Sequence, residues 1–231
     1  MEPSIAEIIN DADALYDRRE DIENVRKSLA LLEKAECLRG YQAAWRMARA
    51  LFFLGQESDS KREAMALHAG GASAGRRAVS LDRSRVEGCF WLGVNLALLA
   101  RLETPIKALP TALRARQFLK LAVGLDPRYH GAGPLRVLAR LQHRLPPLFG
   151  GGTSRARASL ERAITLAPGN TVTRLYFAEL LIDIRDREGA RVQLESLLRA
   201  PVEPGWNFET TRDREIAREM LRNAKLLQIA E

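Results

Sequence analysis

Apolar residues recur at intervals of three and four along almost the whole chain, and no stretch shows the sustained alternation that marks a half-buried strand. Polar residues fill the positions between them, as in helices with one buried face. Some of these stretches begin with a serine followed three residues later by glutamate, a pair that satisfies free amides at a helix N-terminus. The pattern predicts an all-α protein, with helix starts at Ser4 with Glu7, Ser60 with Glu63, and Ser84 with Glu87.

Prolines divide the second half of the chain at similar intervals and point to an internal repeat. Pro127, Pro168 and Pro201 each end an amphipathic stretch and are 41 and 33 residues apart. Small and apolar residues precede the first two prolines by 12, 8 and 5 residues: Ala115, Leu119 and Ala122 in one repeat, and Ala156, Leu160 and Ala163 in the next. This pattern, a small residue followed by two that fill the seam between helices, resembles the second helix of a tetratricopeptide repeat (TPR).

The matching first helices complete five predicted helix pairs, in which apolar residues again recur at helical spacing. Arg49 is an exception, because it occupies a position where the repeat prefers a small residue. A final helix from about residue 211 to residue 229 would cover the apolar face of the last pair. We therefore predict one domain over residues 1–231, a right-handed superhelical array of TPR-like pairs at residues 4–40, 41–83, 84–127, 128–168 and 169–201.

Charge and hydropathy narrow the classes of function. The net charge is +7, yet basic residues are interspersed with acidic ones and form no basic tail. Nucleic-acid binding is therefore not expected, although an RNA-binding helical array stays a third interpretation that salt-dependent retention of polynucleotide would reveal. The longest apolar run, Cys89–Ala100, is too short to span a membrane. No export signal is visible in the first ten residues, which predicts a cytoplasmic protein, or a periplasmic one if a signal was removed.

No pattern in the sequence predicts catalysis, a metal site or a cofactor. The three histidines fall on separate segments without the spacing of a helical zinc site, and no nucleophile motif is present. The glycines at 150–152 follow a predicted helix and precede Thr153, whereas a Walker-type phosphate loop follows a strand and carries a lysine. These glycines predict an interhelical turn in the fourth pair. Cys37 and Cys89 lie in apolar helical patterns and are predicted to be buried thiols.

A candidate binding groove follows from helix geometry. Residues two before, and two, five and six after, the apolar anchor of each first helix should face the concave side of the array. An apolar groove bordered by arginines suits an amphiphilic organic acid or an acidic helix of a partner protein. In the alternative interpretation, the arginines form a solvated face paired with Glu179 and Asp183. The predicted groove residues are Arg46, Phe53, Phe90, Val94, Arg136, Arg140, His143, Arg144, Leu175, Glu179 and Asp183.

The segment from about Trp91 to Pro201 contains "GVNLALLARL", followed in order by the elements "GAGP", "GG" and "LAPxN". In these motifs and their order the segment resembles the TatT family, the TPR partners of TRAP transporters. It implies a non-enzymatic, extracytoplasmic helper that associates with the solute-binding protein of an organic-acid transporter. It also implies a pore or groove open to organic ligands.

The chain departs from that family at its start, where members typically carry a lipoprotein signal with its cysteine. No such cysteine precedes Cys37. Either the precursor was trimmed before Glu2, or the chain is an intracellular relative with a different partner. The sequence therefore leaves open a second function, an intracellular TPR adaptor that binds a peptide or helix of a partner protein. It also leaves open a homo-oligomer.

Overall fold

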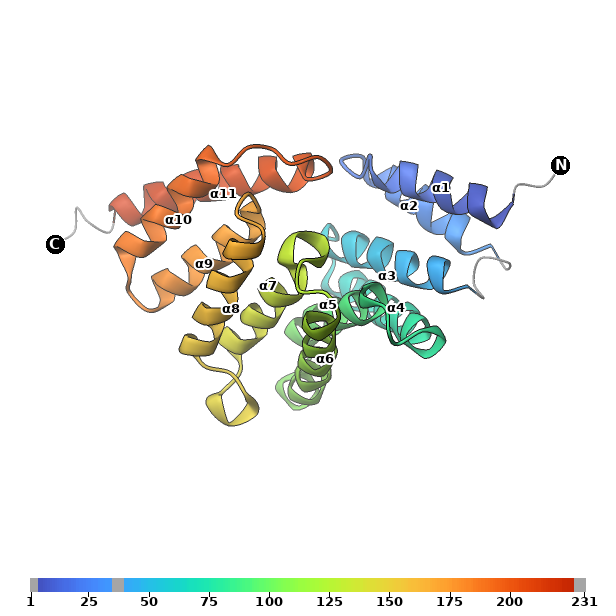
Figure 1. The fold of residues 1–231 in the computed structure, drawn as a ribbon, viewed down its shortest axis with the longest axis horizontal. Coiled ribbons are helices and arrows are strands. Elements are labelled where there is room, and N and C mark those ends of the chain that lie inside the picture. Colours follow the sequence, from blue (N-terminus) through green and yellow to red (C-terminus); the bar gives the residue numbers. More distant parts are fainter. Residues whose placement is uncertain (1–3, 35–39, 227–231) are drawn as a thin grey trace. The chain divides into compact units, whose positions relative to one another are not determined.

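The computed structural model describes residues 4–34 and 40–226, and Cys37 lies outside these ranges. The described residues are mostly helical and form no strand, which confirms the predicted all-α fold (Figure 1). The helices are α1 (Ile5–Tyr16), α2 (Ile22–Leu32), α3 (Tyr41–Gln56), α4 (Lys61–Leu81), α5 (Val86–Leu102), α6 (Pro105–Leu125), α7 (Tyr129–Arg144), α8 (Thr153–Leu166), α9 (Thr171–Asp183), α10 (Arg187–Arg199) and α11 (Asn207–Leu226), with a short 3-10 turn η2 (Pro147–Phe149).

Two of the three predicted serine starts are confirmed. The Ser4 hydroxyl accepts the Glu7 N–H at 3.2 Å, and the Glu7 carboxylate accepts the Ser4 N–H at 2.7 Å. Ser60 caps α4 by accepting the Glu63 N–H at 3.4 Å. These bonds satisfy amides that the first helical turn leaves without partners, so each serine fixes where its helix begins.

Two helices begin at other residues than predicted. The Ser84 hydroxyl donates to Asp82 at 2.6 Å and does not cap the helix, and α5 begins at Val86 after Arg85 as its N-cap. Helix α11 already begins at Asn207, where the Trp206 carbonyl accepts the first helical hydrogen bond at 2.9 Å. Apolar spacing alone does not encode helix boundaries to the residue, which explains both differences.

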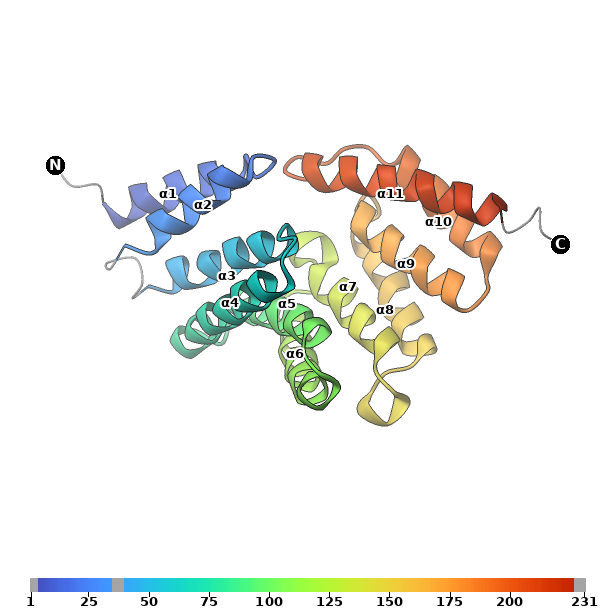
Figure 2. The same ribbon diagram turned by 180° about the vertical axis from the view of Figure 1, so that it is seen from behind.

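The contacts divide the chain into two compact units: unit 1 ends at Asp126 and unit 2 begins at Pro127. In unit 1 successive helices from α1 to α6 pack on one another, and α3 also contacts α1 and α5. In unit 2 successive helices from α7 to α11 do the same, and α9 also contacts α7 and α11. Within each unit the first helices of neighbouring pairs therefore meet, as in a helical repeat array (Figures 1 and 2). The single domain over the whole chain stays a prediction.

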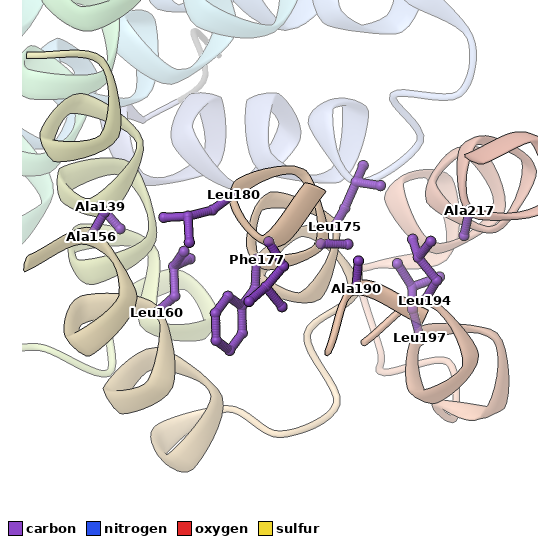
Figure 3. Packing of buried hydrophobic residues seen from close by; sticks show 12 residues of the cluster. Ala139, Ala156, Leu160, Leu175, Phe177, Leu180, Ala190, Leu194, Leu197 and Ala217 are labelled. Carbon is purple, nitrogen blue, oxygen red and sulfur yellow. The ribbon is translucent and has the colours of Figure 1, made fainter. Parts of the chain in front are cut away.

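The six predicted seam residues of the repeats are all buried, each 2% exposed or less. In unit 2, Ala156 and Leu160 of α8 belong to a core cluster with Leu180 of α9, and the cluster continues through α10 to Ala217 of α11 (Figure 3). Helix α11 thus covers the last pair, as predicted. Cys89 is a buried free thiol, also as predicted.

The three glycines after η2 form the predicted turn between α7 and α8. Gly150 and Gly152 have φ angles of 79° and 118°, a region that favours glycine. The Gly152 N–H donates to the Gln142 carbonyl at 2.8 Å, and a Cβ on Gly151 would lie only 1.7 Å from the Leu145 carbonyl oxygen. The glycines are therefore required by a close backbone approach at the end of α7.

Candidate partner-binding site

The four apolar residues of the predicted groove are buried: Phe53, Phe90, Val94 and Leu175 are each 5% exposed or less. Phe53 meets Tyr16 edge-on, with ring centroids 6.1 Å apart, and Leu175 belongs to the core cluster of unit 2. Helix periodicity identifies the face on which such residues lie, but not the side chains that pack over it. At these four positions the expected open apolar trough is filled by the protein itself.

Arg46 lies in unit 1, where α1 packs on α3. Its guanidinium stacks on Trp45, 4.2 Å from the ring centroid, and contacts both carboxylate oxygens of Asp13 at 2.8 to 3.0 Å. Arg49 donates to the same carboxylate at 2.6 Å and stacks on Tyr16 at 3.9 Å. We call Asp13, Arg46 and Arg49 the α1/α3 seam.

Two arginines on one carboxylate set the electrostatics of the α1/α3 seam. Partial burial raises the pKa of Asp13, but the hydrogen bond from Arg46 and the charges of both arginines outweigh it and hold the pKa below its usual value. Asp13 is therefore ionised at neutral pH. The seam keeps one positive charge in excess, which is a property that a negatively charged partner could use.

A second seam forms in unit 2, where α7 packs on α9. Residues three and four apart share a helix face, so two side chains of α7 can meet two of α9. Arg140 forms an ion pair with Glu179 and stacks on Tyr176, 4.4 Å from the ring centroid. The His143 Nε2 lies 3.1 Å from the Asp183 carboxylate. We call Arg140, His143, Glu179 and Asp183 the α7/α9 seam.

The exposed end of the α7/α9 seam carries charges of both signs. Arg144 and Asp183 are the last residues of their helices, and both are exposed. Burial lowers the pKa of His143; the Asp183 charge raises it, and the charges of Arg144 and Arg140 lower it further, so the net shift is downward. His143 is therefore neutral at pH 7 and donates its Nε2 proton to Asp183. The imidazole positions the carboxylate without adding a charge.

Arg136 is not part of this surface, although it lies one helical turn before Arg140. It is 4% exposed, and its Nη1 donates to the Gly131 carbonyl at 2.8 Å and to Asn170 Oδ1 at 3.1 Å. The backbone makes this possible because residues 130–132 have left-handed φ angles of 51° to 61°. The interpretation of a solvated arginine face therefore does not hold for Arg136.

The family model for the TRAP transporter T-component matches residues 20–227 of this chain. The chain belongs to this family. The match extends the resemblance seen between Trp91 and Pro201 to almost the whole chain. No curated protein matches this family member.

Among solved structures, this T-component family member is similar to a thermophilic TPR protein of Thermus thermophilus. The two chains share 20% sequence identity with a TM-score of 0.70, over 93% of this chain and 98% of the other. A likeness at this identity shows the fold alone, and it confirms the predicted TPR-like repeat array. In the part of the chain that the structure describes, no helix is long and apolar enough to cross a bilayer.

Sequence reasoning missed two polar residues that organise these sites. It missed Asp13 because the residue lies on a different helix from the arginines that it binds, although Arg49 at a position for a small residue was a usable signal. It missed Asn170 as a contact of Arg136 because the "LAPxN" element was interpreted as a family marker alone. Both residues bind arginines on other helices, and such pairings depend on how helices pack rather than on local spacing.

Proposed function

We propose that this family member is a non-enzymatic scaffold that binds the solute-binding protein of a TRAP-type organic-acid transporter. The observation that carries the proposal is the family match over residues 20–227. A helical repeat fold supports it, because stacked helix pairs build extended surfaces for partners. The proposal includes an extracytoplasmic location, which is the alternative to the cytoplasmic location predicted above.

The proposed contact in unit 2 is the exposed end of the α7/α9 seam together with Arg144. Arg140 and His143 are held by their carboxylate partners, which keeps this surface preorganised. Arg144 forms no ion pair with any residue that the structure describes, and its exposed guanidinium can bind a carboxylate of the partner by two parallel hydrogen bonds. In unit 1, the excess positive charge of the α1/α3 seam favours the same kind of partner, one with an acidic contact surface.

Affinity purification of the tagged full chain from native membranes and from soluble extract tests the partner. Recovery of a solute-binding protein is expected. Recovery of cytosolic proteins alone would contradict the transporter role and favour the intracellular TPR adaptor. Light scattering of the purified complex then gives its mass, which separates a mixed complex from a homo-oligomer.

The contact surface is tested with Arg144→Glu in a binding assay against the recovered solute-binding protein. Reversing an exposed interface charge is expected to weaken binding by about threefold to tenfold, mainly through slower association at low salt. Arg218→Glu is the matched control, because Arg218 is an exposed arginine on α11 of the same unit. Equal weakening by both variants would mean that only overall charge matters and that the seam is not the contact.

A further inference from the structure

A buried polar cluster lies in unit 2 where α7 and α9 begin. Its centre is Arg136, whose Nη1 reaches the Gly131 carbonyl and Asn170 Oδ1, as described above. Its Nη2 has one long contact, 3.5 Å, to the His130 carbonyl. Trp206 lies beside the cluster, with the Arg136 guanidinium carbon 5.6 Å from its ring centroid. The Nη2 group of the guanidinium is therefore only weakly hydrogen-bonded by its neighbours.

The charge of Arg136 has no contacting counter-charge among the described residues, since no carboxylate lies within ion-pair distance. Asp213 and Glu209 are near enough to influence it, but Asp213 accepts from Thr171 at 2.8 Å and from Arg212 at 3.0 Å. A buried cation without a contacting anion is costly, because water no longer solvates it. The guanidinium therefore has no carboxylate in direct contact, and the charges of Asp213 and Glu209 act on it only from a distance.

The orientation of the Asn170 amide is fixed by three hydrogen bonds to its oxygen. Asn170 Oδ1 accepts the Thr173 N–H and the Thr173 hydroxyl, each at 3.0 Å, and the Arg136 Nη1 at 3.1 Å. A flipped amide would place its donor against these donors, so the nitrogen must lie on the other side. Asn170 is 2% exposed, and its Nδ2 has no acceptor among the described residues. A buried donor left without an acceptor bears its full desolvation cost.

The idle donor lies close to Gly131, which Trp206 also borders. A Cβ on Gly131 would lie 2.7 Å from Asn170 Nδ2 and 3.2 Å from Trp206 Cζ2, so both groups border the same side of this glycine. Trp206 is partly exposed and also packs edge-on against the His130 ring, at 4.8 Å between centroids. It follows Gly205, which has a φ of 78° and ends the turn before α11. Trp206 is therefore a partly exposed residue at the edge of the cluster.

We infer that this cluster binds a small anion through a carboxylate or phosphate group, with Asn170 Nδ2 and Arg136 as the donors. One such group supplies an acceptor for the amide and, at the same time, an anionic group in direct contact with the guanidinium. A buried water would supply the acceptor but not the charge. The site lies wholly in unit 2 and is separate from the proposed contact with a solute-binding protein.

The ligand class is tested by titrating the full chain with inorganic phosphate, succinate and chloride at constant ionic strength. Calorimetry and the thermal midpoint are the readouts. We expect saturable binding and a raised midpoint with phosphate or succinate but not with chloride. A response to phosphate alone identifies a phosphate-bearing ligand, and a response to succinate alone a carboxylate. No saturable binding, or the same response to all three anions, would overturn the inference.

The residues are tested with Asn170→Asp, which keeps the capping oxygen and replaces the idle donor with a negative charge beside Arg136. Anion affinity should fall at least about tenfold, because the site then contains its own anion. The thermal midpoint without added anion should stay the same or rise. Asp186→Asn is the matched control, since Asp186 caps α10 in the same unit by accepting the Gly189 N–H at 2.9 Å. It should leave anion affinity unchanged.

A second variant keeps the test decisive if Asn170→Asp does not fold. In Asn170→Ser the hydroxyl can still cap α9, while the amide donors are lost. Its anion affinity should also fall. Unchanged affinity in the Asn170 variants that fold would overturn the assignment. These measurements need no solute-binding protein, so their failure and the failure of the scaffold proposal are distinguishable.

Discussion

Unit 1 and unit 2 each contain a buried asparagine, and the two amides differ in how fully they are hydrogen-bonded. Asn95 in unit 1 donates to the Ala48 carbonyl at 2.9 Å and to the Trp91 carbonyl at 2.8 Å, and its Oδ1 lies 3.3 Å from His68 Nδ1. The side chain of Asn170 in unit 2 forms hydrogen bonds through its oxygen only. A saturated amide ties helices together, whereas an amide with idle donors needs a further group. The difference indicates a structural role for Asn95 and supports the binding role inferred for Asn170.

The same substitution at both positions tests this difference and has the largest expected effect. Asn95→Asp turns two donors into acceptors that face carbonyl oxygens, and it buries a charge. We expect it to lower the free energy of unfolding by about 3 kcal/mol. Asn170→Asp loses no existing hydrogen bond and gains an attraction to Arg136, so its free energy of unfolding should not fall. Urea denaturation of both variants measures the two values.

Asn10→Asp provides the control for the paired substitution, because Asn10 is exposed on α1 of unit 1. Its effect should stay within about 0.5 kcal/mol, as for most surface changes. Equal losses at positions 95 and 170 would show that both amides are structural. That result would remove the physical basis for an anion site in unit 2.

A methyl group beside Asn95 should produce the next largest effect. A Cβ on Gly71 would lie 2.3 Å from Asn95 Oδ1, and three interactions hold that amide in place. We expect Gly71→Ala to destabilise the chain by about 2 kcal/mol, even though alanine favours the helix. At the neighbouring Gly70 the added Cβ would be 3.6 Å from Leu51, an ordinary contact. Gly70→Ala should therefore be neutral or stabilising by up to about 1 kcal/mol, and similar losses for both variants would show that the Asn95 amide is free to move.

The partner of Asn95 should make the stability of the chain sensitive to acid. Burial lowers the pKa of His68 more than its hydrogen bond with Asn95 raises it, and the charge of Arg101 lowers it further. As the pH falls, the unfolded chain therefore binds a proton at this histidine before the folded chain does. Stability is lost below about pH 6.5, the ordinary histidine pKa. The loss approaches about 1.4 kcal/mol per pH unit until the folded pKa is reached. In unit 2, Arg136 stays protonated throughout this range.

His68→Gln checks the pH effect, because glutamine does not titrate but can still bond to Asn95. The slope of the free energy of unfolding against pH, between pH 5 and pH 8, should then be smaller than in the parent chain. The decrease corresponds to at most one bound proton. His143 also has a lowered pKa, so His143→Gln serves as the comparison. An unchanged slope in His68→Gln would mean that His68 does not carry the acid sensitivity of unit 1.

The fold was predictable from the sequence because close helix packing restricts which residue types occur at regularly spaced positions. Ala115 and Ala156 occupy equivalent positions before Pro127 and Pro168, and both are fully buried where two helices meet. A position of this kind tolerates only a small side chain, so the constraint appears directly in the residue type. Helix pairs and their order follow from such positions without any knowledge of long-range contacts.

The sites were only partly predictable, for two physical reasons. Spacing assigned Phe90 to an open groove, but neighbouring side chains cover it, and nothing in its own helix records that coverage. The Arg136 cluster depends on three consecutive left-handed residues, only one of which is a glycine, and on an asparagine 34 residues away. Arginines on helix faces could be recognised as candidates, while their partners and burial had to come from the structure.

The smallest expected effects extend the comparison to the two exposed seams. Asp13 and Glu179 have similar side-chain exposure, 30% and 29%, but Asp13 binds two arginines and Glu179 binds one. Partly exposed ion pairs contribute little, so Glu179→Gln should cost about 0.5 kcal/mol in urea denaturation. Asp13→Asn should cost about twice as much, because it also leaves two neighbouring guanidinium groups to repel each other. High salt should reduce the difference, since screening weakens that repulsion. Equal costs at low salt would show that the second arginine adds nothing to the α1/α3 seam and that its excess charge is balanced elsewhere in unit 1.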